Sequence, residues 1–128
     1  MIIISLNKTL ILLAHAFVVW ALCGATIAIG RANIGMERTL VVHAVAAPLF
    51  AAAVSLFYYR KYNYTTPLQT ALVFLCFVMA MDAGLVAPVF EKSYNMFTNI
   101  LGTWIPFGLI FLATLATGMV NAQVRRKP

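Results

Sequence analysis

The side chains able to carry acid–base or metal chemistry are few in this sequence. They are three carboxylates, two histidines and two cysteines: Glu37, Asp82, Glu91, His15, His43, Cys23 and Cys76. Their spacing forms no CxxC or HExxH metal motif and no pair of carboxylates, and no glycine-rich phosphate loop is present. No serine or cysteine stands in a recognised nucleophile signature. We therefore expect neither an enzyme nor a metal site.

Asp82 is the acidic residue with the most unusual surroundings, because it lies inside a long apolar run. A charge at the centre of a membrane helix raises the insertion free energy by ~2.5–3.5 kcal/mol, so Asp82 should face protein or water. On a helix it shares a face with Phe74 and Val78, whereas Ala80 and Gly84 lie on the other side. If the small residues pack within the protomer, Asp82 faces a second protomer, a partner subunit or a water-filled groove. The alternative is a hydrogen bond to a neighbour without further role.

Both histidines also lie within apolar runs. His43 and Asp82 lie about 6 Å and about 12 Å from the same predicted boundary, at ~1.5 Å rise per residue, so a direct or water-bridged contact is feasible. Such a pair could bind an ion or relay a proton; a buried histidine without a role is the alternative. His15 lies roughly 15 Å from His43 in level, which argues against both ligating one haem. His15 could still be a single ligand of a cofactor whose identity is unknown.

Composition indicates the class of protein that holds these side chains. Of the 128 residues 63% are hydrophobic and 9% are charged, and the mean hydropathy is +0.94. So few charges cannot cover a surface exposed to water, which excludes a soluble enzyme. The net charge is +6, but the basic residues lie between apolar runs instead of forming one stripe, so nucleic acid is not an expected partner.

Four apolar segments, at about 9–30, 39–59, 68–90 and 99–121, are separated by three short polar breaks. Each is long enough, at ~1.5 Å rise per residue, to cross a hydrocarbon core of ~30 Å. Breaks this short join antiparallel neighbours. The sequence therefore predicts an all-α polytopic membrane protein: a single transmembrane domain over residues 1–128 that forms a four-helix up-down bundle with short loops in the lipid bilayer.

Helix starts, kinks and contacts can be predicted from particular residues. Thr66 and Pro67 should begin the third helix, as N-cap and first-turn proline. Three prolines inside segments predict kinks or local unwinding: Pro48, Pro88 and Pro106. Membrane helices pack closely at small residues, so alanine and glycine stripes should mark contacts. These are Ala14, Ala21, Ala25 and Ala28 in the first segment, Ala46, Ala47 and Ala51 in the second, Ala80, Ala83, Gly84 and Ala87 in the third, and Gly102, Ala113 and Ala116 in the fourth.

The distribution of Lys and Arg predicts the orientation. With the N-terminus inside, the cytoplasmic side carries six of them (Lys8, Arg60, Lys61, Arg125, Arg126 and Lys127) and the other side carries three (Arg31, Arg38 and Lys92). This excess predicts both termini in the cytoplasm and a location in the cell's inner, or cytoplasmic, membrane. Tyr58, Tyr59 and Trp104 fall near predicted boundaries and are expected to anchor the helices at the membrane interface.

Two functions fit these features. The first is a small oligomeric channel or transporter in which Asp82 is the intramembrane ion or proton site and His43 its partner. The second is a structural or accessory subunit of a larger respiratory, photosynthetic or translocation complex, without activity of its own. A chain of 14.0 kDa can hardly enclose a path alone, so further copies or other membrane subunits are expected as partners. Proline-interrupted helices favour transport, whereas the lack of an internal repeat favours the accessory role.

Overall fold

The computed structural model describes residues 6–126, apart from the side chains of Phe90 and of residues 124–126. Over this range the chain is helical and has no β-strand, and four long helices make up most of it: α1 (Leu6–Asn33), α2 (Met36–Lys61), α3 (Pro67–Met81) and α4 (Ile105–Arg126). Shorter helical segments of tighter or wider turn connect α3 to α4: η1 (Asp82–Phe90), η2 (Asn95–Thr98) and η3 (Ile100–Trp104).

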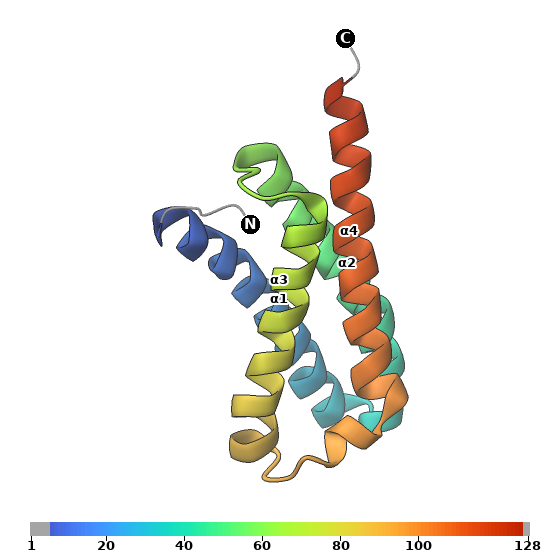
Figure 1. Ribbon diagram of the computed structural model, residues 1–128. Helices are drawn as coiled ribbons and strands as arrows, with labels where there is room; N and C mark the ends of the chain where they lie inside the picture. Colours follow the sequence, from blue (N-terminus) through green and yellow to red (C-terminus); the bar gives the residue numbers. More distant parts are fainter. Residues whose placement is uncertain (1–5, 127–128) are drawn as a thin grey trace.

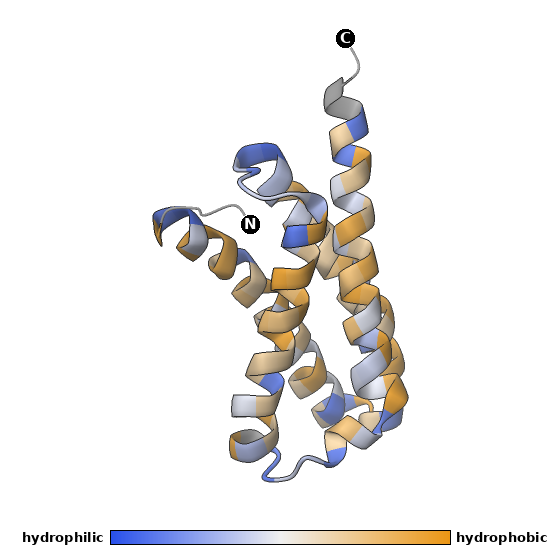
Figure 2. Ribbon diagram, in the orientation of Figure 1, coloured by the Kyte–Doolittle hydropathy of each residue, from blue (hydrophilic) through white to orange (hydrophobic). Residues whose placement is uncertain are grey.

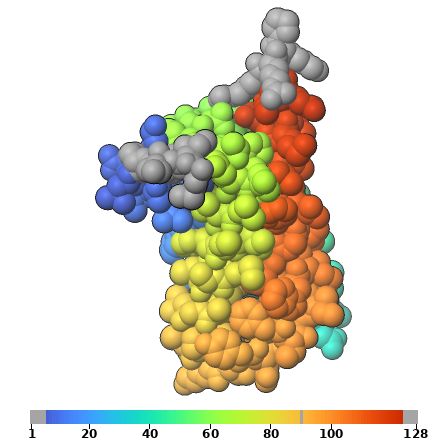
Figure 3. Space-filling view, viewed as in Figure 1, coloured from blue at the N-terminus to red at the C-terminus, as the bar shows by residue number. Residues whose placement is uncertain are grey.

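Consecutive long helices run in opposite directions, so Leu6 and Arg126 lie toward the same end as the α2–α3 connection (Figure 1). We call this the terminal end. The opposite end, which we call the loop end, holds the α1–α2 connection and the segment from η1 to η3 (Figure 1). α2 and α3 each pack against both α1 and α4. The four helices therefore occupy the corners of a square, with α1 diagonally opposite α4, and α3 lies against α4 along the face shown in Figure 3.

Four stretches are long and apolar enough to cross a membrane: Leu6–Asn33, Met36–Lys61, Pro67–Val89 and Ile100–Gln123. Hydrophobic side chains dominate the middle of the bundle, and hydrophilic ones gather toward its two ends (Figure 2). The stretches agree with the segments expected from the sequence to within a few residues at every boundary. The prediction of an all-helical chain with four such helices is confirmed for the described residues.

The start of α3 shows how local sequence sets a boundary. The Thr66 hydroxyl accepts a hydrogen bond from the Gln69 backbone N–H at 3.2 Å, and the Gln69 side-chain oxygen accepts one from the Thr66 N–H at 3.0 Å. Pro67 occupies the first turn, where its missing N–H has no carbonyl to bond. The predicted N-cap and first-turn proline are confirmed, and Gln69 completes a reciprocal capping box.

Large side chains fill the terminal half of the bundle. Tyr58, Tyr59 and Phe74 are fully buried there, together with Val19 and Thr114. α4 approaches this core closely at Gly118, where an added Cβ would lie 2.6 Å from the Tyr59 ring and 2.7 Å from Pro67. Such contacts leave no room for an open passage through this half.

The expectation that small-residue stripes mark the helix contacts is wrong for α1 and for α3. On α3 the buried side is that of Ala71, Phe74 and Val78, whereas Ala80 and, in η1, Ala83 and Gly84 are exposed; Ala87 is the one member of the expected stripe that is buried. On α1 the buried side chains are Leu12, Ala16, Val19 and Cys23, and the predicted stripe is mostly exposed: Ala14, Ala25 and Ala28. Small and large side chains share these contacts, since Ala16 on α1 and Ala71 on α3 are as fully buried as Val19 and Phe74. In α2 the prediction is correct for Ala47 and Ala51, which are buried.

Candidate functional site

A cavity of about 1030 Å³ lies between the helices in the loop-end half of the bundle. Each helix contributes one stripe at the spacing of a single helical face. The principal lining residues are Trp20, Gly24, Ile27 and Arg31 from α1, Met36, Leu40 and His43 from α2, Val78, Asp82 and Val86 from α3 and η1, and Thr103, Phe107 and Ile110 from η3 and α4. Arg31, Met36, Glu91 and Asn95, at the loop end of this lining, are exposed, so the cavity opens there.

Asp82 is partly buried in the wall of this cavity. Its carboxylate oxygen Oδ1 accepts a hydrogen bond from the indole N–H of Trp20 at 3.0 Å. Since Asp82 continues the buried side of α3 that Phe74 and Val78 form, it faces into the bundle. This geometry fits two of the surroundings expected for Asp82: it lines a groove, and it has a hydrogen bond to a neighbour.

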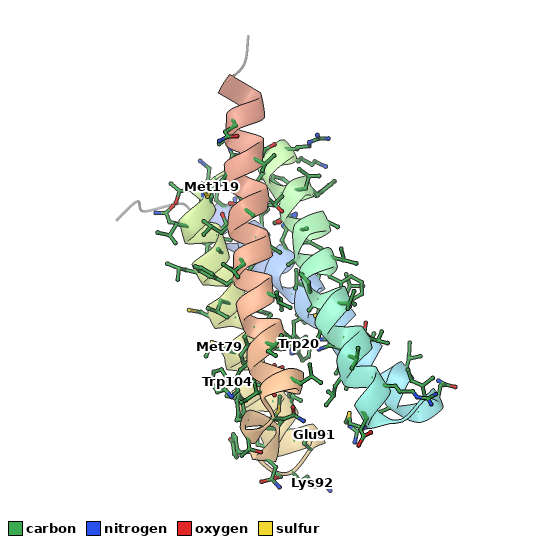
Figure 4. The ribbon with its side chains drawn as sticks, turned by 90° about the vertical axis from the view of Figure 1, so that its right-hand side faces the viewer. Trp20, Met79, Glu91, Lys92, Trp104 and Met119 are labelled. Atoms are coloured by element: carbon green, nitrogen blue, oxygen red, sulfur yellow. The ribbon has the colours of Figure 1, made fainter. Side chains whose placement is uncertain are left out.

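Trp20 is a site residue that the sequence analysis missed. It lies near the middle of α1 and between the helices, well away from Glu91 and Lys92 at the loop end (Figure 4). Tryptophan in membrane helices usually lies near an interface, where its N–H meets water or headgroups. A tryptophan in the middle of an apolar run therefore needs a buried hydrogen-bond acceptor, and this could have indicated a pairing with Asp82.

A change of helix type begins at Asp82. From there to Phe90 the backbone forms the wider π-helical turns of η1, as in the bond from the Glu91 N–H to the Val86 carbonyl at 2.8 Å. Pro88 has no N–H for the Ala83 carbonyl, which lies five residues before it. The Tyr94 hydroxyl donates to that carbonyl instead, at 3.1 Å. Pro88 and Tyr94 thus support an irregular backbone beside the carboxylate, and such π-turns are frequent at functional sites.

The three prolines have different effects on the helices. η1 contains Pro88, and Pro106 is the second residue of α4, two positions after the second π-helical segment, η3, so local unwinding occurs near both. α2 continues as α-helix through Pro48, and the expected unwinding is absent there. The two irregular segments both line the cavity, through Asp82 and Val86 in η1 and through Gly102 and Thr103 in η3.

His43 is 7% exposed and lines the same cavity from α2. The predicted burial between helices is confirmed. The direct contact with Asp82 is not formed, because the Asp82 hydrogen bond comes from Trp20 and neither ring nitrogen of His43 has a partner among the described residues. A buried polar group without a partner is destabilising and uncommon in proteins. His43 is therefore an imidazole beside the cavity whose two ring nitrogens are buried and have no partner among the described residues.

His15 lies in the terminal half, away from the cavity. Its Nδ1 is 2.7 Å from the Ile11 carbonyl oxygen, and its ring packs on Phe57, Tyr58 and Tyr62 with centroids 5.9, 5.3 and 5.4 Å away. Phe57 follows His43 on α2 by 14 residues, or about 21 Å of helix, so the two histidines are far apart. Bonding at Nδ1 leaves Nε2 as the nitrogen through which His15 could ligate a cofactor.

The prediction that Tyr58 and Tyr59 are interface anchors is wrong. Both side chains are buried, and their hydroxyls bond to the protein: Tyr58 with the Thr65 hydroxyl at 2.8 Å, and Tyr59 with the Thr114 carbonyl at 3.0 Å. Their rings fill the space between helices, which is why the polar ends find partners inside. Trp104 is 44% exposed near the loop end and donates to the Phe97 carbonyl at 2.7 Å. Its role as an anchor stays a prediction.

At the mouth of the cavity an ion pair links α1 to the segment after η1. Arg31 donates to the Glu91 carboxylate at 2.9 Å, with side chains 46% and 32% exposed. A pair this exposed contributes ~0–1 kcal/mol of stability. Its main consequence for the site is that the guanidinium nearest the cavity mouth already has a carboxylate partner, so Arg31 is not the counter-ion of Asp82.

The remaining reactive groups do not cluster. Within residues 6–126 no three His, Cys, Asp or Glu side chains are placed to hold a metal ion. Cys23 and Cys76 are both free thiols, the first buried at the cavity wall and the second exposed. The inner part of the site therefore holds one carboxylate, Asp82, with the Trp20 indole and the His43 imidazole in a largely apolar chamber, and the second carboxylate, Glu91, is paired with Arg31 at the mouth.

Fold and site together define an all-helical protein with four helices of membrane-spanning length and apolarity, and with a carboxylate-bearing cavity between them. In comparisons with known proteins, no family model matches the chain, and neither a curated protein nor a solved structure resembles it significantly.

Proposed function

We propose that this chain is a small integral membrane transporter in which Asp82 is the ion or proton site. The observation that carries the proposal is the place of this carboxylate: it lies within a helix long enough to span a membrane and lines a cavity that opens at one end. Carboxylates within membrane spans are energetically unfavourable and commonly mark ion and proton pathways. His43, in the same cavity wall, is the second group able to exchange protons there.

The distribution of basic residues supports an orientation for this transporter. Lys8, Arg60 and Lys61 belong to the terminal end, whereas Arg31, Arg38 and Lys92 belong to the loop end, where Glu37 and Glu91 offset them. The proposal therefore places both termini in the cytoplasm and the cavity mouth on the outer side of the cell membrane.

The packing of the terminal half favours a carrier over an open channel. Tyr58, Tyr59 and Phe74 fill that half, and the exposed polar lining residues of the cavity lie at the loop end. A carrier needs a second conformation in which access is reversed, and the π-helical turns at η1 and η3 are the natural places for the backbone to rearrange. Further copies of the chain complete the pathway in this proposal.

The test is flux through purified protein in liposomes. An applied membrane potential drives protons or monovalent cations, and a pH-sensitive dye or ion electrode follows them. The Asp82→Asn variant should show only the leak of empty liposomes, while its elution volume in detergent stays that of the unsubstituted chain. Glu37→Gln is the matched control, because Glu37 is exposed and lies outside the cavity. Full flux through correctly assembled Asp82→Asn would refute the site.

An accessory subunit remains the second candidate, and the outer face of α3 supports it. Ala80, Ala83 and Gly84 are exposed there, and nothing lies within 4 Å of a Cβ built on Gly84. Small residues on a lipid-facing surface are what a neighbouring membrane helix packs against. If this role is correct, Gly84→Leu should abolish co-purification of other subunits from the native membrane, and Asp82→Asn should not. A chain that purifies alone from that membrane contradicts it.

A further inference from the structure

The charge balance in the cavity constrains what can occupy it. Within residues 6–126 the recorded hydrogen-bond partner of Asp82 is the Trp20 indole, and no lysine or arginine forms an ion pair with the carboxylate. The basic side chain closest to the mouth, Arg31, is paired with Glu91. An ionised Asp82 therefore attracts a cation from outside the chain, because a buried charge is stable only when it is paired.

The dimensions and lining argue against a bare metal ion as that cation. Ca²⁺ and Mg²⁺ take six or more oxygen ligands at short range, and the described residues place no cluster of carboxylates or histidines around Asp82. A volume of about 1030 Å³ is instead at the upper end of the range for pockets that hold organic molecules. The inner wall is formed mainly by apolar side chains, including Ile27, Val78 and Ile110.

The aromatic lining also suits an organic cation. Trp20, which bonds to Asp82, and Phe107 both line the cavity, and aromatic faces attract organic cations through their quadrupoles. His43 is nine-tenths buried in the same wall and has no hydrogen-bond partner for either ring nitrogen. Because those nitrogens have almost no accessible surface, the polar group that meets an occupant of the cavity is Asp82 and not His43.

We infer that the cavity binds an amphipathic organic cation, with the positive centre beside Asp82 and the apolar body against Trp20 and Phe107. This inference rests on the proposed function and names the substrate class of that site. The cation enters from the loop end, where the cavity opens, and exchanges with protons at the carboxylate, so one positive charge occupies the site at a time.

Two ions of matched shape and opposite charge test this directly. Tetraphenylphosphonium and tetraphenylborate are titrated into detergent-solubilised Trp104→Phe protein, which leaves Trp20 as the single indole of the chain. The phosphonium should change Trp20 fluorescence saturably, and the borate should bind at least tenfold more weakly. Adding Asp82→Asn should weaken phosphonium binding at least tenfold and remove the preference for the cation. Glu37→Gln, which removes a carboxylate outside the cavity, should leave both affinities unchanged.

Equal binding of the two ions by the Trp104→Phe protein would overturn the inference, because it would show recognition by apolar contact alone, as for a lipid chain. This comparison needs no change at Asp82, so it stands even if that variant does not fold. Asp82-dependent proton flux without phosphonium binding would also overturn the inference while leaving the proposed proton site intact. Selective phosphonium binding without any flux would support the inference and count against transport.

Discussion

At the scale of single residues, the proposed site depends on Asp82, whose carboxylate accepts the Trp20 indole hydrogen bond at 3.0 Å beside the cavity. Asp82 could be predicted because a charge inside an apolar run is energetically unfavourable whatever the packing. Its hydrogen bond from Trp20 could not, since the two residues are 62 positions apart and meet only through the packing of α1 against α3. The prediction for Tyr58 and Tyr59 was wrong for a similar reason. Their position along the helix suggested the membrane interface, but they lie on the side of α2 that faces the core.

A substitution at His43 tests whether this residue has a structural role or a functional one. Leucine has about the same size and needs no hydrogen bonds, so His43→Leu should leave the unfolding temperature unchanged or raise it by a few degrees. The same variant should transport more slowly, because the cavity loses its second proton-exchanging group. Thermal unfolding followed by circular dichroism, together with flux in liposomes, measures both effects. A fall of many degrees in the unfolding temperature would show that the imidazole has stabilising partners, whereas the structure places none at either ring nitrogen within the described residues.

At the scale of the elements, the sequence predicted where the helices lie better than which of their faces are buried. The four helices follow from the length of the apolar runs, and the α3 start follows from Thr66, Pro67 and Gln69, which are adjacent in sequence. The buried faces of α1 and α3 were predicted wrongly, because small residues were assumed to mark contacts. Which face is buried depends on the side chains of neighbouring helices, and those neighbours are not specified by local sequence.

Gly118 and Gly108 offer a matched test of the α2–α4 contact. A Cβ at Gly118 would lie 2.6 Å from the Tyr59 ring, whereas a Cβ at Gly108 meets no atom within 4 Å. Gly118→Ala should therefore lower the free energy of unfolding by about 1–3 kcal/mol through overpacking. Gly108→Ala should leave it unchanged or raise it by roughly 0.5–1 kcal/mol, since alanine favours the helix. Denaturation in mixed detergent measures both; equal effects of the two changes would contradict the tight packing.

At the scale of the whole molecule, the bundle is closed at the terminal end and hollow at the loop end. The up-down topology was predictable, because short breaks between long helices leave no other arrangement. The cavity was not, since its lining comes from α1, α2, η1, η3 and α4, which are far apart in sequence. In the proposed carrier this cavity belongs to one of two alternating states, and further copies of the 14.0 kDa chain complete the pathway.

The native mass of the assembly can be measured directly. Extracted gently from its own membrane, the protein should have a native mass that is a small multiple of 14.0 kDa after bound lipid is subtracted. Native mass spectrometry resolves this, with dissociation of the particle to identify each chain. A particle that holds other polypeptides or a bound pigment would instead identify an accessory subunit and contradict the proposed homo-oligomer.

The central claim is that water and ions reach Asp82 from one side of the membrane. A cysteine at Gly24 can report on this, because Gly24 lines the cavity and an added side chain meets open space. The native thiols are first removed by Cys23→Ala and Cys76→Ala. Leu22→Cys in the same background is the control, since Leu22 is exposed on α1 but does not line the cavity.

The measurement is the rate at which membrane-impermeant thiosulfonates of either charge modify these cysteines in right-side-out and inside-out vesicles. We predict that Gly24→Cys is modified only from the outer side, faster by the cationic reagent, and that Asp82→Asn removes this preference. Leu22→Cys should stay unmodified from both sides, because a thiol in lipid does not ionise. Modification of Gly24→Cys from both sides at similar rates, or from the cytoplasmic side alone, would contradict a one-sided cavity that leads to Asp82.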